Sequence, residues 1–332
     1  YFGNPVEGAG ADHSNGVVNN LEGGVISSDS RALNIDGIGL TVNNAGEILG
    51  TGDQRNGTVY ADGTADDYSF TNTDTGVIDA GAGNDGSAVS LQTGDVNGDT
   101  VSASVVNDGV FQGRGDAEVG NTIGDGLRVF SSVESASFDG DIENNGLIAG
   151  SEESDVAAGI RIDGGVAVLG TITNNGEVTG SVTAIDATEG GPITFVNGSE
   201  GVVNGDIRLG AGTDSLTNEG TINGVIDGGG GNDDINAGDG DNVVIGGLGN
   251  DSLTGGDGAD VFEFAAGEGL DVVRDFELGV DRLDLSELGP DFDVQANTVQ
   301  DGDDAVISFG DGNAVRLENV DASLLDDDDF LV

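Results

Sequence analysis

The sequence predicts an all-β protein in which the chain winds into a stack of parallel coils, a β-solenoid. Three observations favour this fold class: a nine-residue repeat near the C-terminus, a looser repeat upstream of it, and the composition. The 332 residues include 62 Gly but only 3 Pro, and Val, Ile, Thr and Asn are common. Such a composition indicates many short strands joined by tight turns.

The upstream repeat occupies about residues 18–224 and reads apolar-x-Asn-x-Gly-x-apolar-x-Gly. Its copies are Val42–Gly50, Val105–Gly113, Ile142–Gly150, Ile172–Gly180 and Leu216–Gly224, with looser versions at Val18–Ile26 and Phe195–Gly205. The period of two places the apolar residues, the Asn and the Gly on one side of an extended chain that bends at the Gly. We expect the Asn side chains of successive coils to stack and hydrogen-bond at a shared corner.

The spacing of this repeat is typical of a solenoid. Successive Asn residues at positions 107, 144, 174, 197 and 218 are separated by 37, 30, 23 and 21 residues, and the shrinking intervals predict loops on the early coils. A sandwich of hairpins is the alternative all-β fold, but it needs regularly spaced two-residue turns that the sequence lacks. The motif resembles the passenger repeats of bacterial autotransporters.

The second repeat consists of four consecutive nonapeptides between Gly228 and Glu263 with the pattern Gly-Gly-x-Gly-x-Asp-x-apolar-x. They read GGGGNDDIN, AGDGDNVVI, GGLGNDSLT and GGDGADVFE. The glycines allow a tight turn with inward carbonyls, and the Asp supplies the hard anionic oxygen that Ca²⁺ prefers. The apolar residue of each repeat then predicts a very short strand; these residues are Ile235, Val244, Leu253 and Phe262.

These nonapeptides resemble the RTX repeats of secreted bacterial proteins, which implies a parallel β-roll with Ca²⁺ between successive turns. Two nonapeptides complete one coil in that family, so the resemblance pairs Asp233 with Asp251 and Asn242 with Asp260. Asn242 lacks the charge of an Asp, so we expect its site to be the weaker one and expect the repeats to fold only with calcium. The candidate metal-binding residues are Asp233, Asn242, Asp251, Asp260, Gly229, Gly231, Gly238, Gly240, Gly247, Gly249, Gly256, Gly258, Asp214 and Asp275. A flexible Gly/Asp-rich linker is the alternative, which four in-phase repeats disfavour.

The two repeat types run in phase. Leu209–Thr217 is itself a nonapeptide of the second kind that contains Asp214, and it leads directly into the corner motif at Asn218. The sequence therefore predicts one uninterrupted stack, divided into a β-solenoid over 1–227, a calcium-binding β-roll over 228–263 and a closing segment over 264–332.

The last segment resembles the one that closes the β-roll in RTX proteins exported by type I secretion. A solenoid needs such a cap because its last coil exposes an apolar cross-section and open strand edges. We expect the cap to be filled by the Phe residues at positions 262, 264, 276, 292 and 309. Asp326–Asp329 followed by Phe330–Val332 resembles the uncleaved secretion signal of that family, and we expect this tail to add little to the core.

Charge excludes several classes of partner. With 62 acidic and 9 basic residues the net charge is −53, so nucleic acid and anionic membranes are not expected partners, and cations are needed against self-repulsion. The chain has no Cys to form disulfides, so we expect bound calcium to stabilise the extracellular fold in their place. No apolar run approaches the roughly 20 residues of a membrane-spanning helix. We expect a bacterial extracellular or cell-surface protein.

The sequence contains few residues of the types that carry out catalysis. His13 is the single His, Cys and Lys are absent, and neither His-Glu-x-x-His nor Gly-x-Ser-x-Gly occurs, so we do not expect an enzyme. The enzymatic alternative is a β-helix polysaccharide lyase or epimerase, with Arg128, Arg161 and Arg208 on one solenoid face. The favoured hypothesis is a structural protein that self-assembles into a homopolymer, an S-layer or fibre; an adhesin for a glycan or surface polysaccharide is the alternative.

Overall fold

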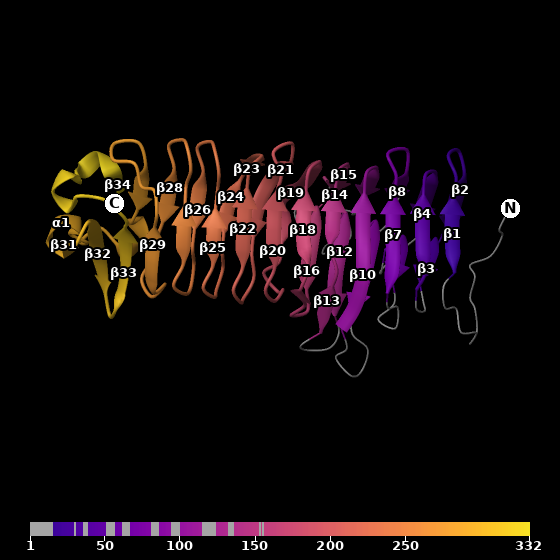
Figure 1. Ribbon diagram of the computed structural model, residues 1–332, viewed down its shortest axis with the longest axis horizontal. Helices are drawn as coiled ribbons and strands as arrows, with labels where there is room; N and C mark the ends of the chain where they lie inside the picture. The colour runs from indigo at the N-terminus through magenta and orange to yellow at the C-terminus, as the bar shows by residue number, and fades with distance from the viewer. Residues whose placement is uncertain are drawn as a thin grey trace.

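The protein is a rod of stacked parallel coils that ends in a small cap, as the computed structural model shows (Figure 1). The structure describes residues 16–29, 31–35, 39–50, 57–61, 67–80, 86–93, 100–114, 124–131, 136–152, 154 and 156–332. His13 lies outside these residues. The all-β solenoid predicted from the sequence is confirmed. No helix among the described residues has the length and apolar character to cross a membrane.

One face of the rod is a single long sheet, called sheet A here. Its parallel strands are β1 (Val17–Asn20), β4 (Thr41–Asn44), β7 (Tyr68–Asn72), β10 (Thr100–Asn107), β14 (Ile142–Asn144), β18 (Thr171–Asn174), β20 (Thr194–Asn197), β22 (Ser215–Asn218), β25 (Asp234–Asn236), β27 (Ser252–Thr254) and β29 (Leu270–Val273). Two short strands extend this face beside β10: β13 (Ser137–Asp139) and β17 (Ala167–Val168). Every neighbouring pair in this series is parallel, so each strand is one rung of the stack.

The remaining strands form two further rows. The first row is β2 (Val25–Ser28), β5 (Glu47–Gly50), β8 (Val77–Asp79), β11 (Val110–Gln112), β15 (Leu147–Ala149), β19 (Glu177–Asp186), β21 (Val202–Arg208) and β23 (Thr221–Asn223). The second row is β3 (Leu33–Ile35), β6 (Val59–Ala61), β9 (Val89–Thr93), β12 (Leu127–Ser131), β16 (Ile160–Asp163), β24 (Val225–Asp227), β26 (Val243–Ile245), β28 (Val261–Glu263), β30 (Arg282–Asp284) and β34 (Phe330–Leu331).

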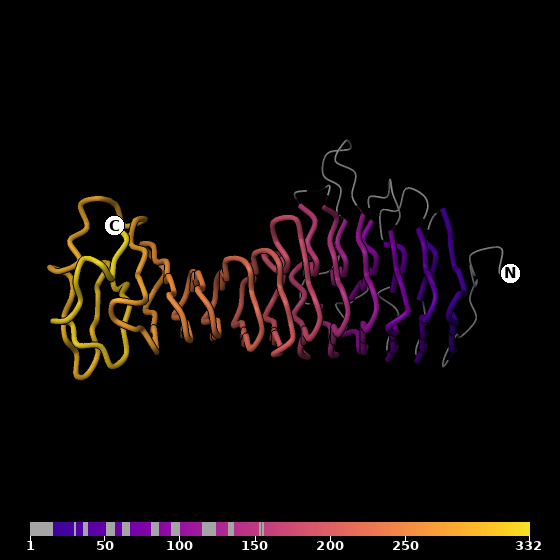
Figure 2. Tube along the Cα trace, turned by 90° about the horizontal axis from the view of Figure 1, so that it is seen from above, coloured from indigo at the N-terminus to yellow at the C-terminus, as the bar shows by residue number. Residues whose placement is uncertain are grey.

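The rod changes from three rows of strands to two. The long strands β19 and β21 belong to both rows, and after β23 only the second row continues beside sheet A. Nonapeptide coils need only two strands because two repeats complete one turn, and Figure 2 shows the rod narrowing along them. The stack nevertheless runs on without a break, because β22 pairs directly with β25.

The core is a set of apolar columns along the rod axis. The column under sheet A is built, in register, from Val42, Phe70, Val105, Ile142, Ile172, Phe195, Leu216, Ile235, Leu253, Val273 and Leu317. All of these side chains are at most 1% exposed. The four apolar nonapeptide residues, Ile235, Val244, Leu253 and Phe262, lie on very short strands, as predicted, and are fully buried.

A ladder of asparagines runs along the corner that follows each sheet A strand. Each amide nitrogen donates to the side-chain oxygen of the next Asn at 2.7–2.8 Å, and the members are Asn20, Asn44, Asn72, Asn107, Asn144, Asn174, Asn197 and Asn218. The predicted stacking of Asn corners is thereby confirmed. Asn72 was not among the predicted corners, because its turn is two residues longer and its glycine, Gly76, comes four positions later.

The cap closes the C-terminal end of sheet A with antiparallel strands. After β30 and the short helices η2 (Ser286–Leu288) and α1 (Val294–Asn297), the chain forms β31 (Thr298–Asp301), β32 (Asp304–Gly310) and β33 (Asn313–Leu317), and β33 pairs with β29. Two more short helices follow, η3 (Ala322–Leu324) and η4 (Asp327–Asp329). As predicted, Phe residues fill the cap: the ring of Phe309 contacts those of Phe264 and Phe292, and the ring of Phe262 contacts that of Phe276.

The C-terminal tail is part of the fold, which corrects the expectation that it adds little to the core. Phe330 and Leu331 form β34, the last rung of the second row, against β30. Asp329 is only 2% exposed, and its carboxylate accepts a hydrogen bond from the backbone N–H of Gly279 at 2.8 Å. The tail therefore covers a strand edge that the roll would otherwise leave open.

Candidate calcium site

The glycine turns of the nonapeptides lie at two corners of the rod. The first corner follows each sheet A strand and is the one that carries the Asn ladder; the turns 237–242 and 255–260 continue it. The second corner precedes each sheet A strand and contains the turns 209–214, 228–233 and 246–251. Asn218, the last rung of the ladder, donates to the carbonyl oxygen of Ala237 at 2.6 Å, so the ladder ends where the glycine turns begin.

At the second corner the carboxylates form a column. In each step, the Oδ1 atom of one Asp accepts the backbone N–H of the acidic residue one coil earlier. Asp214 N donates to Asp233 and Asp233 N donates to Asp251, both at 2.8 Å, and Asp251 N donates to Asp271 at 3.0 Å. The structure thus brings Asp233 beside Asp251 and also adds Asp214 and Asp271 at the two ends.

The first corner repeats this arrangement after the Asn ladder. Asn242 N donates to Asp260 Oδ1 at 2.8 Å, and Asp260 N donates to Asp281 Oδ1 at 3.0 Å. Asn242 and Asp260 therefore lie one coil apart, at the eighteen-residue spacing expected from the sequence. Sequence reasoning missed Asp271 and Asp281, although their distances of 20 and 21 residues from Asp251 and Asp260 were a usable signal.

The glycines are required by the shape of these turns. The glycines at the second and fourth positions of all four repeats have positive φ angles, between 78° and 149°. These residues are Gly229, Gly231, Gly238, Gly240, Gly247, Gly249, Gly256 and Gly258. A Cβ atom on Gly249 would lie 1.3 Å from the carbonyl oxygen of Gly231 in the preceding coil. In the three repeats that carry Asp, the glycine at the first position makes room for the carboxylate: a Cβ on Gly255 would lie 2.2 Å from Asp260 Oδ2.

One oxygen of each key carboxylate has no hydrogen-bond donor. Four such buried oxygens accept no hydrogen bond: the Oδ2 atoms of Asp214, Asp233, Asp251 and Asp260. Each of these residues is at most 2% exposed. A buried anionic oxygen without a partner costs free energy, and a bound cation removes that cost. Carboxylate and backbone carbonyl oxygens are the ligands that Ca²⁺ prefers, so this donor set fits calcium.

The pKa values of these carboxyls agree with that requirement. Burial, together with repulsion from neighbouring carboxylates, raises the pKa of Asp233 and that of Asp271 to about 7; burial raises that of Asp260 to about 6. The pKa values of Asp214 and Asp251 are also raised by burial. Without a cation, burial therefore opposes the ionisation of these groups, whereas a bound divalent cation favours the ionised form.

The described residues contain no group of three acidic or His side chains that could hold a metal by themselves. A calcium ion at these corners would thus be held by single carboxylates together with backbone carbonyls of the glycine turns. Asp275 does not share the unpartnered geometry, because its carboxylate accepts the N–H groups of Gly255 and Gly256 at 3.0 and 2.9 Å. Asp275 therefore fixes the start of a glycine turn.

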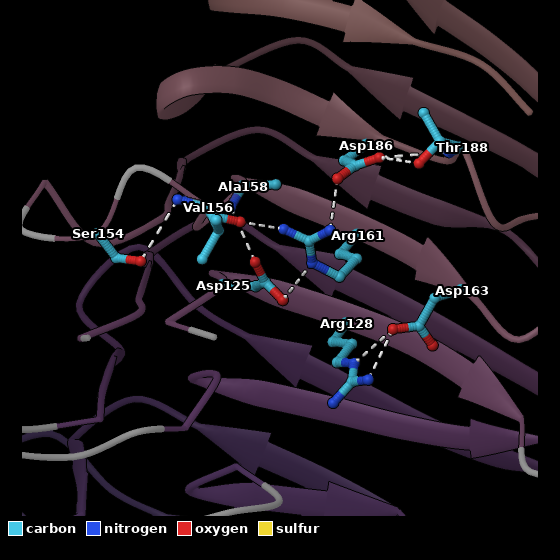
Figure 3. A network of polar contacts seen from close by, with 9 residues as sticks. All are labelled: Asp125, Arg128, Ser154, Val156, Ala158, Arg161, Asp163, Asp186 and Thr188. Atoms are coloured by element: carbon cyan, nitrogen blue, oxygen red, sulfur yellow. Dashed lines mark hydrogen bonds and ion pairs between the residues drawn. The ribbon is translucent and has the colours of Figure 1, made fainter. Parts of the chain in front are cut away.

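The alternative catalytic residues also lie on one row. Arg128 and Arg161 are neighbours in register on β12 and β16, and Arg208 on β21 is two rungs from Arg161. All three are paired with carboxylates: Arg128 with Asp163, Arg161 with Asp125 and Asp186, and Arg208 with Asp206. Figure 3 shows the Arg128–Asp163 pair beside the cluster in which Arg161 bridges Asp125 and Asp186.

Asp125 has the most perturbed carboxyl in this network. Burial raises its pKa to about 6, although the Arg161 guanidinium lowers it. The residue is 0% exposed, and its two oxygens accept from Ala158 N at 2.8 Å and Arg161 Nε at 3.0 Å. The raised pKa therefore reflects the burial of this carboxyl, and both of its oxygens are already engaged by Arg161 and the Ala158 N–H, as in a structural ion pair.

Comparison with known proteins identifies the repeats. Residues 227–262 and 237–270 match the family model of the RTX calcium-binding nonapeptide repeat, in 4 copies. These repeats bind Ca²⁺ and mark the chain as a secreted calcium-binding protein. No curated protein matches the chain.

Among solved structures, the extracellular lipase LipA from Serratia marcescens is similar to this chain at 14% sequence identity and a TM-score of 0.30. The similarity covers 77% of this chain and 42% of the lipase chain. This chain thus spans less than half the length of that lipase, and a similarity at this level carries no argument about activity.

Proposed function

We propose that this protein is an extracellular structural protein that assembles with copies of itself into a surface layer or fibre in the presence of calcium. The observation that carries the proposal is the continuous stack of coils, in which the polar groups of the described corners join one coil to the next. The Asn ladder, the carboxylate columns and the ion pairs of Arg128 and Arg161 all act between successive coils. A rod built in this way suits a mechanical role.

The charge supports a role for calcium in assembly as well as in folding. A net charge of −53 on 332 residues makes copies of the rod repel one another. Divalent cations between facing carboxylates convert that repulsion into attraction, so we infer that calcium controls whether rods associate. A non-enzymatic role is supported by the pairing of Arg128, Arg161 and Arg208 with carboxylates.

The test is to image the purified full-length chain by negative stain and to follow light scattering in millimolar Ca²⁺, in Mg²⁺ of equal concentration, and in EGTA. We expect filaments or sheets in Ca²⁺ that dissolve on chelation, and particles of single-chain size in Mg²⁺ and EGTA. Circular dichroism of the same samples reports folding separately from assembly.

A chain that is folded but monomeric at high concentration in millimolar Ca²⁺ contradicts the proposal. Incubation with bacterial surface polysaccharides then separates the alternatives. Binding without cleavage indicates an adhesin, and release of shorter oligosaccharides indicates a lyase of the β-helix type.

A further inference from the structure

The glycine turn 237–242 carries Asn242 at the position where the other three nonapeptides carry Asp. Asn242 lies at the first corner, is 5% exposed, and stacks directly on Asp260 of the next coil. Its turn has the same backbone form as the others, because Gly238 and Gly240 have φ angles of 78° and 114°. The difference between the turns is therefore confined to the side chain that fills them.

The Asn242 amide forms hydrogen bonds that a carboxylate cannot form. Its Nδ2 atom donates to the carbonyl oxygen of Gly240 at 2.9 Å and to that of Gly238 at 3.1 Å, both within its own turn. Both partners are acceptors, so they fix the orientation of the amide, with nitrogen and not oxygen facing the carbonyls. A carboxylate oxygen only accepts, and at this position Asp233, Asp251 and Asp260 each leave a buried Oδ2 unpartnered.

The same device closes the corners of the Asn ladder upstream. Asn72 donates to Gly76 O at 3.1 Å, and Asn144 to Gly146 O and Asn197 to Gly201 O, both at 3.2 Å. In each case an amide nitrogen satisfies a glycine carbonyl of the first corner. The turn at Asn242 thus has the backbone conformation of the other nonapeptide turns, but its glycine carbonyls accept hydrogen bonds from an amide nitrogen, as at the Asn corners.

We propose that the Asn242 amide nitrogen takes the place of a calcium ion in the turn 237–242. This turn then binds no calcium of its own and is closed in the absence of metal, whereas the Asp turns at 228–233, 246–251 and 255–260 need the ion. The inference rests on the calcium binding of the repeats and is independent of any assembly of the rod. The sequence predicted a weaker calcium site at Asn242; we propose instead that this turn needs no calcium.

The test is to count calcium ions on the full-length chain. Equilibrium dialysis against Ca²⁺ alone compares the wild type with Asn242→Asp, for which we expect one additional bound ion per chain. We expect the thermal midpoint of Asn242→Asp to fall below that of the wild type in calcium-stripped buffer, because the turn loses its internal donor. Loading with Ca²⁺ should reverse the order or remove the difference.

Asp233→Asn is the matched reverse exchange and should bind one ion fewer than the wild type, with a higher midpoint in calcium-stripped buffer. Asn242→Ala removes the amide altogether and should lower the midpoint equally with and without calcium, while calcium affinity stays unchanged. Dialysis starts from calcium-loaded protein, so the count for Asn242→Asp is obtained even if that variant unfolds without metal. An unchanged calcium count in Asn242→Asp, or a loss of calcium affinity in Asn242→Ala, overturns the proposal.

Discussion

The Asn ladder allows a sharp test of what holds the coils together, because buried and exposed asparagines stand side by side in the sequence. Asn174 is 0% exposed and accepts from Asn144 at 2.7 Å while donating to Asn197 at 2.8 Å. The next residue, Asn175, is exposed and donates to Asn145 at 3.0 Å. Replacing each by Ala removes an asparagine stack of similar geometry, in one case inside the rod and in the other on its surface.

The magnitude follows from the groups that each change leaves without a partner. In Asn174→Ala the Oδ1 atom of Asn197 loses its donor, and Asn144 Nδ2 loses its shortest acceptor but keeps Glu177 O at 3.1 Å. A buried polar group left unsatisfied costs about 1–3 kcal/mol, so we expect a loss of about 2–4 kcal/mol. Water replaces the partner of Asn175, and we expect about 0.5 kcal/mol or less for Asn175→Ala.

Urea unfolding of the full-length chain in calcium-containing buffer, followed by circular dichroism, measures both losses. Hydrogen exchange on the same samples shows whether the loss is local, and we expect faster exchange at the strands β18 and β20 in Asn174→Ala only. If the two variants lose the same free energy within about 0.5 kcal/mol, the buried ladder does not stabilise the stack and the reasoning is wrong.

Two further predictions concern the roll and its cap. Because burial raises the pKa of Asp233 and that of Asp271 to about 7, above the value of about 3.9 for an unfolded Asp, the folded calcium-free chain binds more protons than the unfolded one. The stability of the calcium-free chain should therefore increase as the pH falls from about 7 to 4, which thermal midpoints of calcium-stripped protein measure. Midpoints that stay flat or fall as the pH is lowered over this range would contradict the raised pKa values of Asp233 and Asp271. Deletion of residues 329–332 should lower the thermal midpoint in calcium, because β34 pairs with β30 and Asp329 accepts from Gly279. Deletion of the exposed Val332 alone is the control, and equal midpoints for the two deletions would mean that the tail is not part of the cap.

Local patterns in the sequence were sufficient for the repeating parts of the fold. A period of two with one Asn and one apolar residue in each copy predicts a corner and a core column, and the ladder from Asn107 to Asn218 follows that pattern. Fixed nine-residue spacing predicts that Asp251 stacks on Asp233, because two repeats make one coil. Short-range periodicity carries this information because each coil contacts only its neighbours.

The sequence was less informative where the spacing changes or the partners are distant. Asp271 and Asp281 extend the carboxylate columns, but the chain inserts two or three extra residues before them, so the nonapeptide pattern is lost. The pairing of Phe330 with Leu283 joins segments 47 residues apart, and nothing local to either segment indicates it. The unpartnered Oδ2 atoms also emerge only in three dimensions, because they depend on which neighbour uses Oδ1.

The two halves of the rod solve one physical problem in two ways. A tight corner brings backbone carbonyls together in a buried place, and each corner needs a positive or hydrogen-bearing group to satisfy them. Up to Asn218 that group is an amide nitrogen supplied by the chain itself, so these corners form without metal. From Asp214 onwards at the second corner, and at Asp260 on the first corner, the chain supplies carboxylates, whose free oxygens add to the need for a cation. Calcium dependence is therefore expected to begin at the second corner with Asp214 and Asp233 and at the first corner only after Asn242, so withdrawal of calcium should lower the stability of the roll more than that of the Asn-lined solenoid.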